Sequence, residues 1–559
     1  MSIMNNCPSR VEALEALRPK SNRSRSSFVL RLVSLIISIV VVMSGLVVTS
    51  GAAVAVEPSA EPRVSDDPPA VAPAPVCGNA DILDGPAEPP TNATVVPAGN
   101  NNDMFYDFRQ ADRTFWFAPG VHMMDADPYG QIEPGSGTTF VGAPGAIFDG
   151  QGINRAAFTQ GATNVTIEHL TIRGFVAPQD QGVVNKDAAR GWKVRNNTIT
   201  ENKGAGLMAG RDNVYSDNCI KDNGQYGINA CCGGHSETTD IANFVLDGNE
   251  IVGNNTDDWE TQVPGCGCSG GVKFWINRNV TVTDNWVHDN RGVGLWLDNN
   301  NRGFVIERNL IEENDDQALF IEAGYDARVR FNTMRRNAIV AGKKKADKGD
   351  TFPVGAVYVS ESGSPEGYGL ASPMVISDND FIDNWGGVIL WENPDRYCSS
   401  EAHTHPPFCT IKTDLYDDAQ CETAVENDIP DGIDKYRCRW STENIVVENN
   451  DFSIDKAAVG ASCVGAQYCG LNGVFSNWGS FDEFPGYTIP WRLTFQQGIV
   501  FRTNHYVGDW WFAGFQQVRP DGKRVSWADW TAPAPPVPPV FTHDNRPTTF
   551  GQDQGSTYN

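Results

Sequence analysis

The sequence predicts an all-β fold in which short parallel strands stack as successive coils of a solenoid. Three observations lead to this prediction. A motif with paired asparagines recurs with a period in the low twenties of residues. Short runs rich in β-branched residues alternate with Gly, Asn and Asp. Between residues 105 and 530, almost no segment has the apolar period of a helix.

The repeated motif has the form V-x-x-N-x-[IVLF]-x-x-N, followed by a few loose residues and a short apolar strand. Clear copies begin at Val194 and Val214, and the shortest spacings between copies are 21, 23 and 24 residues. Longer gaps are interpreted as coils with loop insertions. The asparagine pairs are Asn197 and Asn202, Asn218 and Asn223, Asn249 and Asn254, Asn285 and Asn290, Asn309 and Asn314, Asn332 and Asn337, and Asn379 and Asn384, with an incomplete copy at Asn450.

A coil of about three short strands accounts for this period, because each strand can pair in parallel with its copy about 4.8 Å away. Leucine-rich repeats share the period but need several leucines per unit and usually a helix. The recurring asparagine fits the turns between strands. It tolerates a left-handed backbone and can hydrogen-bond to its counterpart in the next coil.

With this repeat, and with "PGAIFDGQGINRAAF" from Pro144, the chain resembles the right-handed parallel β-helix proteins of the pectin-lyase-like superfamily. The resemblance covers roughly residues 105 to 530. It implies a right-handed parallel β-helix solenoid with loop insertions, and a secreted or surface protein that binds, cleaves or epimerises a polysaccharide. Viral tailspikes and adhesins are non-enzymatic members of the superfamily.

The two ends of the chain differ from the repeat. Residues 1–55 have basic residues, an apolar run from Leu32 to Val48 and small residues near Ala55, as in a secretory signal peptide. An uncleaved membrane anchor is the alternative. Residues 56–104 are predicted to be a Pro/Ala-rich disordered linker, and residues 531–559 a Pro-rich tail. The aromatic segment 500–530 is interpreted as the last coil and its cap, or alternatively as a small sugar-binding lobe.

The cysteines predict disulfides. The chain has thirteen, of which Cys7 lies in the signal region, and the remaining even number in an exported chain is typical of disulfide pairing. Zinc is the rival for the cysteines at 231–232 and 266–268. Residues 396–440 contain four more and are predicted to form a disulfide-stapled insert. The basic stretch 341–350 is interpreted as a solvated loop.

Charge restricts the partners. A formal net charge of −26 repels nucleic acid and anionic bilayers, so neither binding to nucleic acid nor membrane insertion after signal cleavage is expected. It also repels polyanionic glycans unless a cation or a basic patch intervenes. A neutral polysaccharide is easier to accept.

The strand after the second asparagine of each repeat places one carboxylate pair on neighbouring coils. Gly294-Leu-Trp-Leu-Asp298 is matched 24 residues later by Ala318-Leu-Phe-Ile-Glu322, so Asp298 and Glu322 should be about 5 Å apart at the backbone. Such a pair could perform the acid–base work of glycoside hydrolysis. It could equally hold calcium, although no cofactor is certain.

The same register predicts an exposed face that could bind sugar rings. The residues assigned to it are Lys273, Trp275, Trp296, Phe320, Tyr325, Tyr358, Trp391 and Glu392. The alternative is that these rings pack under a neighbouring loop. The sequence therefore predicts an exported polysaccharide lyase or glycoside hydrolase with Asp298 and Glu322 as catalytic residues. The alternative function is a non-catalytic glycan-binding or adhesive surface protein.

Overall fold

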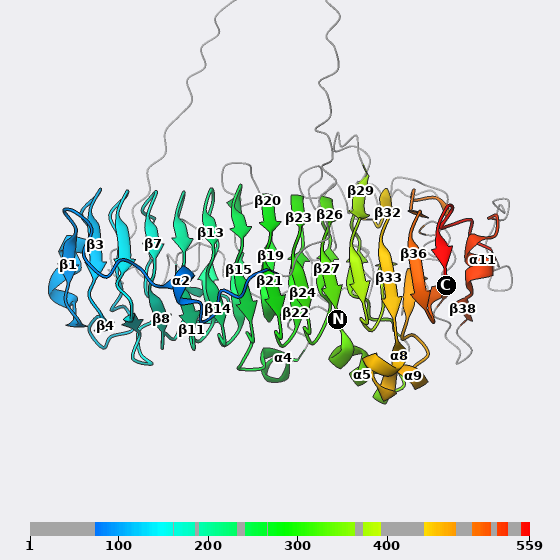
Figure 1. Ribbon diagram of the computed structural model, residues 1–559, viewed down its shortest axis with the longest axis horizontal. Helices are drawn as coiled ribbons and strands as arrows, with labels where there is room; N and C mark the ends of the chain where they lie inside the picture. Colours follow the sequence, from blue (N-terminus) through cyan, green and yellow to red (C-terminus); the bar gives the residue numbers. More distant parts are fainter. Residues whose placement is uncertain are drawn as a thin grey trace, which may run out of the picture. The chain divides into compact units, whose positions relative to one another are not determined.

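The computed structural model describes residues 73–159, 161–184, 189–231, 241–264, 267–350, 352–363, 373–392, 441–476, 493, 495–515, 523–534 and 549–559. Within them, three long sheets run along a stack of coils, and the strands of neighbouring coils lie side by side (Figure 1). The predicted parallel β-helix is confirmed. The signal peptide, its alternative as an anchor, and the insert 396–440 lie outside the described residues.

The first sheet, sheet A, has fourteen strands. They are β1 (Thr94–Val96), β3 (Thr114–Phe117), β5 (Thr139–Gly142), β7 (Thr166–Glu168), β10 (Lys193–Arg195), β13 (Val214–Ser216), β16 (Ile241–Ala242), β17 (Val245–Asp247), β20 (Asn277–Thr283), β23 (Arg302–Glu307), β26 (Tyr325–Arg330), β29 (Met374–Ser377), β32 (Ile445–Glu448) and β35 (Val500–Arg502).

Sheet B also has fourteen strands. They are β2 (Gly99–Asn100), β4 (Gly120–Met123), β6 (Ala146–Asp149), β8 (Thr171–Arg173), β11 (Thr198–Thr200), β14 (Cys219–Lys221), β18 (Glu250–Val252), β21 (Trp286–His288), β24 (Leu310–Glu312), β27 (Thr333–Arg335), β30 (Asp380–Ile382), β33 (Asp451–Ile454), β36 (His505–Gly508) and β39 (Thr557–Tyr558).

Sheet C has eleven strands, all parallel except β38, which pairs antiparallel with β37. They are β9 (Gly182–Val184), β12 (Ala205–Met208), β15 (Tyr226–Ala230), β19 (Gly270–Trp275), β22 (Val293–Asp298), β25 (Leu319–Glu322), β28 (Val357–Ser360), β31 (Val388–Trp391), β34 (Leu471–Ser476), β37 (Trp511–Phe515) and β38 (Lys523–Val525). The helices in the described residues are short: α2 (Ala80–Leu83), η1 (Asn102–Met104), α3 (Phe105–Phe108), α4 (Trp259–Gln262), α5 (Ile339–Asp347), α8 (Lys456–Val459), α9 (Ala461–Gly465) and α11 (Trp527–Thr531).

The predicted asparagines stack in two ladders, one at each end of the sheet B strands. Asn309 is typical. Its Nδ2 donates to Asn332 Oδ1 at 2.9 Å and to Val282 O at 2.9 Å, and its Oδ1 accepts from the backbone and the side chain of Asn285 at 3.0 Å each. Buried donors and acceptors in these turns are thereby satisfied coil after coil.

One detail of the ladder prediction is wrong. The left-handed backbone does not fall on the ladder asparagine but on the residue before it, for example Asp217, Asp284 and Arg308. The side-chain amide of the ladder asparagine stays in the row that joins the coils, and the preceding residue adopts the left-handed conformation that turns the chain.

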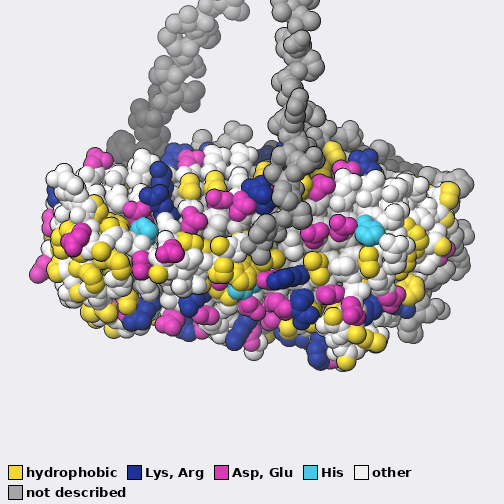
Figure 2. Space-filling view, viewed as in Figure 1, with side chains coloured by type: hydrophobic (Ala, Val, Ile, Leu, Met, Phe, Trp, Pro, Cys, Tyr) yellow, Lys and Arg dark blue, Asp and Glu magenta, His cyan; other side chains and the backbone are white. Residues whose placement is uncertain are grey.

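Charged side chains of both signs are intermingled on the surface (Figure 2). Many join adjacent coils, such as Arg308 with Asp284 at 2.8 Å and Arg195 with Glu168 at 2.7 Å. These pairs are partly exposed, and such pairs contribute about 0–1 kcal/mol each. They reduce the repulsion within a chain of large net negative charge.

The predicted linker is wrong for residues 73–104. Strands β1 and β2 are the first coil of the solenoid, and Val96 is fully buried in its core. Residues 73–92, here called the strap, run along several coils, as the dark blue segment with α2 shows (Figure 1). The composition of this segment predicts disorder because it has little to bury, but it is fixed by polar bonds instead.

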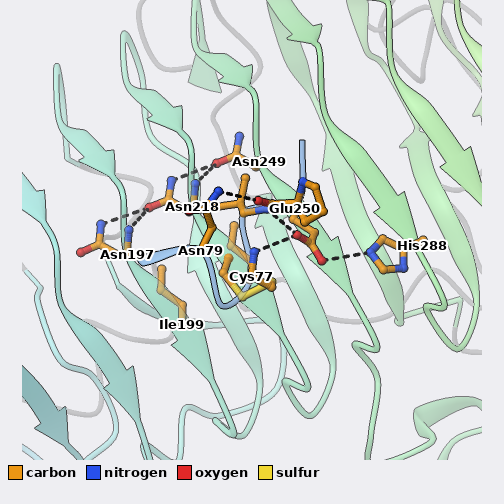
Figure 3. The surroundings of a disulfide bond; sticks show 12 residues. Cys77, Asn79, Asn197, Ile199, Asn218, Asn249, Glu250 and His288 are labelled. Carbon is orange, nitrogen blue, oxygen red and sulfur yellow. Dashed lines mark hydrogen bonds and ion pairs between the residues drawn. A yellow bond between two sulfur atoms is a disulfide. The ribbon is translucent and has the colours of Figure 1, made fainter. Parts of the chain in front are cut away.

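The strap is attached at four places. Cys77 forms a disulfide with Cys219, and the backbone N–H groups of Val76 and Cys77 donate to Glu250 Oε2 at 2.7 and 2.8 Å (Figure 3). Further on, Leu83 O lies 3.2 Å from His169 Nδ1. Trp116 Nε1 donates to Pro86 O at 3.0 Å. The strap thus ties the coil of β18 to that of β3.

The C-terminal prediction also needs correction. Trp530 of α11 is fully buried, as expected of a cap, but the described part of the tail, residues 549–559, belongs to the fold. Strand β39 pairs with β36, and Phe550 lies in the core. Asp553 accepts hydrogen bonds from Trp530 Nε1 at 2.6 Å and Tyr506 Oη at 3.0 Å. Residues 535–548 lie outside the described part.

Two smaller predictions have mixed outcomes. The stretch 341–350 is mostly helix α5, because Gly342 lets the helix pack against Trp385. Cys463 pairs with Cys469, and Cys231 and Cys268 are disulfide-bonded, which overturns the zinc alternative for those two. No helix in the described residues is long and apolar enough to cross a membrane.

Candidate functional site

Sheet C has the register that the sequence predicts. Strands β19, β22, β25, β28 and β31 pair so that two rows of outward-facing residues run across the coils. The first row is Lys273, Trp296, Phe320, Tyr358 and Ile389, and the second row is Trp275, Asp298, Glu322, Ser360 and Trp391. The alternate residues, such as Leu295 and Leu297, are buried in the core.

The carboxylates of the second row are deeply placed and have different partners. Asp298 is 5 % exposed and Glu322 1 %. Asp298 Oδ2 forms an ion pair with Lys273 Nζ at 2.9 Å, whereas Glu322 Oε2 accepts a hydrogen bond from Trp296 Nε1 at 3.3 Å. The Lys273 ammonium lies 4.0 Å from the centre of the Trp296 ring, a cation–π contact. Lysine, tryptophan and both carboxylates therefore form one connected group.

Sequence reasoning missed Asp180, which joins this group from the loop before β9. Its backbone is left-handed, with a φ of 58°, as at many turn positions of this chain. Gln225 holds it twice, accepting from Asp180 N at 2.8 Å and donating to Asp180 Oδ1 at 2.9 Å, and Asn229 Nδ2 donates to Asp180 O at 2.9 Å. These three bonds hold both the backbone and the carboxyl of Asp180 in one place.

The pKa of Asp180 is also shifted from its usual value. Burial raises the pKa of Asp180, and the positive charge of Lys273 and the hydrogen bond from Gln225 offset part of that increase. Burial, together with the charges of Asp180 and Asp298, raises the pKa of the neighbouring Tyr226 well above its usual value. The two side chains share a hydrogen bond, so Asp180 is a candidate proton donor.

A part of this signal was available in the sequence. Asn229 pairs with Lys273 in the register of sheet C, so extending the first row by one coil finds it. Tyr226 begins the same strand, β15, and Gln225 immediately precedes it. Asp180 lies in a segment with no repeat, and only the fold brings it to the site.

Three buried polar atoms near the ion pair have no hydrogen-bond partner within the structure. They are Asn229 Oδ1, Trp275 Nε1 and Asp298 Oδ1. Buried polar atoms are nearly always paired, because leaving one unpaired costs about 1–3 kcal/mol. Their gathering on coils β15, β19 and β22 is what a site prepared for a polar ligand requires.

The predicted exposed aromatic face is only partly present. Trp296 and Tyr358 are 7 % and 5 % exposed, and Phe320 lies between them, stacked on Trp296 at 5.1 Å and edge-on to Tyr358 at 4.9 Å. Trp275, Phe320 and Trp391 are half-buried.

At the β28–β31 end, the alternative of a packed cluster is correct. Tyr358 belongs to an apolar cluster with Ile389, Tyr468, Leu471 and Phe475, against which Phe320, Phe352, Trp391 and Trp511 pack. The rings of Phe352 and Trp391 meet edge-on at 4.9 Å.

Two residues predicted for this face lie elsewhere. Tyr325 opens β26 of sheet A, is 3 % exposed, and has the Arg302 guanidinium 5.4 Å from its ring centre. Glu392 follows β31 at the corner, is 1 % exposed, and accepts from Gln497 Nε2 at 2.8 Å. The chain leaves the sheet C strand directly after the second row, so residues beyond that row belong to the corner or the next sheet.

The calcium alternative remains a prediction. In the described ranges, no group of three or more His, Cys, Asp or Glu side chains is arranged to hold a metal ion. Asp298 and Glu322 are two carboxylates at one register position, and one of them is already paired with a lysine.

Comparison with known proteins confirms the fold. The chain matches the family described as "Right handed beta helix region" over residues 146–257 and 230–366. The fold of the chain is a right-handed parallel β-helix. No curated protein matches.

Several solved structures are similar at low identity. The A-module of mannuronan C-5 epimerase AlgE6 from Azotobacter vinelandii is 14% identical, covers 54% of this chain and 78% of that chain, and has a TM-score of 0.38. The catalytic unit of the GH87 alpha-1,3-glucanase from Streptomyces thermodiastaticus is 14% identical and has a TM-score of 0.48, and the match covers 78% of this chain and 68% of that chain. The periplasmic alginate epimerase AlgG is 10% identical, covers 76% and 86%, and has a TM-score of 0.31.

Proposed function

We propose that this chain is an exported polysaccharide-active enzyme, and that glycoside hydrolysis is the reaction its site supports best. One observation carries the proposal. Asp298 and Glu322 occupy the same register position on neighbouring coils, Trp296 donates a hydrogen bond to Glu322, and Asp298 Oδ1 is buried without a hydrogen-bond partner. Glycoside hydrolysis needs two carboxyl groups in unlike environments flanking the bond that breaks.

The two environments suggest the two roles. Asp298 is ion-paired with Lys273, so it serves as the carboxylate that attacks the anomeric carbon or activates water. Glu322 has a neutral N–H donor in Trp296 and serves as the acid that protonates the leaving oxygen. Neighbouring coils stack about 4.8 Å apart. The carboxyl groups of retaining glycosidases are roughly 5–5.5 Å apart, a separation that side chains projecting from neighbouring coils can reach.

The rigid sheet supplies positioning. Each carboxylate is on a strand hydrogen-bonded on both sides, β22 between β19 and β25, and β25 between β22 and β28. Sites on such strands are held more precisely than sites on loops. The half-buried rings of Trp275 and Phe320 are on the same face and would stack on sugar rings along the solenoid axis.

A non-catalytic glycan-binding protein is the second candidate. It is favoured by the small exposure of the two carboxylates, 5 % and 1 %, against the greater exposure of Trp275, Phe320 and Trp391. In that case, sugar would contact the rings and leave the carboxylates to the packing of the sheet.

A screen against soluble polysaccharides separates these functions. New reducing ends without ultraviolet absorbance indicate a hydrolase, and both signals together indicate a lyase. Retardation in an affinity gel with neither signal indicates a binding protein. For a substrate that the wild type degrades, Asp298→Asn and Glu322→Gln should each abolish turnover and leave binding nearly intact. Trp296→Ala should weaken binding. If both carboxylate variants keep full activity, the proposed pair is wrong.

A further inference from the structure

We propose that the site takes a neutral, hydroxyl-rich glycan and discriminates against uronic-acid polymers. This inference rests on the proposed function and names its substrate class. It follows from the bonding state of Lys273, from the charges near it, and from the three buried polar atoms that lack partners.

Lys273 is the cation that a uronate carboxylate would need, and its capacity is already used. An ammonium group has three N–H donors. Those of Lys273 face Asp298 Oδ2 at 2.9 Å, the carbonyl oxygen of Gly267, and the ring of Trp296, whose centre is 4.0 Å away. A uronate could bind Lys273 only by displacing Asp298.

The surrounding charge opposes the same exchange. Among the described residues of the two rows, Lys273 is the only cation, and the carboxylate of Asp298 already balances its charge. A uronate would bring a second negative charge to this one cation in a buried place, where its repulsion from Asp298 is screened much less than in water.

The unpartnered atoms favour hydroxyl groups. Asn229 Oδ1 and Asp298 Oδ1 are acceptors and need donors, whereas Trp275 Nε1 is a donor and needs an acceptor. A sugar hydroxyl both donates and accepts, so neighbouring hydroxyls can satisfy all three atoms. A uronate keeps its ring hydroxyls but has a carboxylate in place of the C6 hydroxyl, and that group only accepts, so it could satisfy Trp275 alone.

The substrate class restricts the reaction. Elimination by a lyase requires a proton made acidic by a carboxylate on the neighbouring carbon, which a neutral sugar lacks. A neutral glycan therefore leaves hydrolysis, in which the bond between the anomeric carbon and the bridging oxygen breaks. The hydroxyl of a water molecule joins that carbon, and a proton joins the leaving oxygen.

Affinity electrophoresis tests the discrimination directly. The wild-type chain would be run in gels containing neutral glucans, galactans, xylans and mannans, and in parallel gels containing polygalacturonate or alginate, at low and high salt. We expect at least one neutral polymer to retard the protein about tenfold more strongly than either polyuronate. That difference should persist at high salt.

The sharpest variant is Asp298→Asn, because it frees the Lys273 ammonium. It should bind polyuronate several-fold better than the wild type at low salt, and the gain should disappear at high salt or when Lys273→Met is added. Asp103→Asn is the matched control. It removes one exposed negative charge in the first coil and should change nothing. Should Asp298→Asn fail to fold, the wild-type comparison still decides.

The outcomes separate this inference from the proposed function. If the wild type binds or degrades a polyuronate as well as any neutral glycan, the inferred substrate class is wrong and the polysaccharide function stands. If no polymer of either class is bound or degraded, the proposed function itself fails.

Discussion

Glu250 on sheet B and Asp298 on sheet C are equally hidden carboxylates with different bonding. Each is 5 % exposed. Glu250 uses both oxygens, Oε2 for the N–H groups of Val76 and Cys77 and Oε1 for His288 Nε2 at 3.3 Å (Figure 3). Asp298 uses Oδ2 for Lys273 and leaves Oδ1 unpaired.

The difference teaches that burial alone does not identify a functional carboxylate in this solenoid. A buried charge is tolerated when its oxygens are satisfied, and then it holds the structure together. Glu250 meets that condition by fixing the strap. Asp298 has only one of its oxygens bonded, and the unpaired polar atoms of Asn229 and Trp275 are on strands β15 and β19 of the same sheet. A substrate could donate a hydrogen bond to this unpaired oxygen.

The largest expected effect comes from exchanging the two carboxylates for amides. Asp298→Asn should lower kcat by about 10²–10⁴-fold, as loss of a general base or nucleophile does, and it should also lower stability because the buried Lys273 ammonium loses its carboxylate. Glu250→Gln should leave kcat unchanged. Initial rates on the substrate found in the screen, measured for both variants beside the wild type, check this prediction.

Either of two results would contradict the different roles assigned to Asp298 and Glu250. Full activity in Asp298→Asn would remove the functional meaning of its unpaired oxygen. A large loss of activity in Glu250→Gln, with the fold intact by circular dichroism, would mean that the strap site contributes to catalysis.

The next effect concerns the aromatic end of the same face. Tyr358 is buried in the apolar cluster with Ile389 and Phe475, so Tyr358→Ala should lower the free energy of unfolding by about 3–5 kcal/mol. Trp275→Ala, on a half-buried ring at the polar end, should cost less stability and weaken sugar binding more. Urea midpoints and affinity gels measure the two effects. If Tyr358→Ala weakened binding and spared stability, the aromatic end would be part of the sugar surface.

The register of this face could be predicted because the repeat is strict where coils stack. The offset of 24 residues between Asp298 and Glu322 is one coil, and the same spacing separates the ladder residues Asn285 and Asn309. The features that follow from the stacking of coils could therefore be predicted from the sequence: the fold, the ladders and the two rows.

The rest depended on parts that do not repeat. Asp180 reaches the site from an irregular loop, held by Gln225 and Asn229. The composition of the strap predicts disorder, since few of its residues are apolar. In the structure, one disulfide and a few hydrogen bonds to Glu250 hold it in place. The burial of Tyr358 depends on segments far away in the chain, such as Tyr468. Local pattern carries none of this information.

A smaller effect is expected on the structural side of the comparison. Glu250→Gln keeps one acceptor oxygen for the two strap N–H groups and turns its N–H₂ group toward His288, so the negative charge that strengthens these bonds is lost. Bonds to charged groups contribute about 1.5–3 kcal/mol, and the urea midpoint should fall accordingly. Reduction of the Cys77–Cys219 disulfide by a thiol should become faster, because the strap opens more often. An unchanged reduction rate would show that the disulfide alone fixes the strap.

The smallest effect is a dependence of strap stability on pH. Burial alone would raise the pKa of Glu250, but the hydrogen bonds from His288, Cys77 and Val76 lower it below its ordinary 4.5. Burial alone would lower the pKa of His288, but its bonds to Glu250 and Asp289 raise it above 6.5. Around His288, Trp286 stacks on the imidazole at 4.1 Å and donates to Glu312 Oε1 at 2.8 Å.

The sign follows from each shift. The depressed carboxyl contributes stability that is present above pH 4.5 and is lost as the pH falls through its lower folded value. The raised imidazole contributes stability that is full below pH 6.5 and is lost as the pH rises through its higher folded value. Protection of the Val76 and Cys77 amides in hydrogen exchange, corrected for the intrinsic rate, should therefore be greatest between about pH 4.5 and 6.5 and should decline toward pH 8. His288→Asn should remove the alkaline decline, whereas His505→Asn, an imidazole in β36 away from the strap, should leave it unchanged. A decline that persists in His288→Asn would assign it to another group and leave Glu250 as a pH-independent anchor over that range.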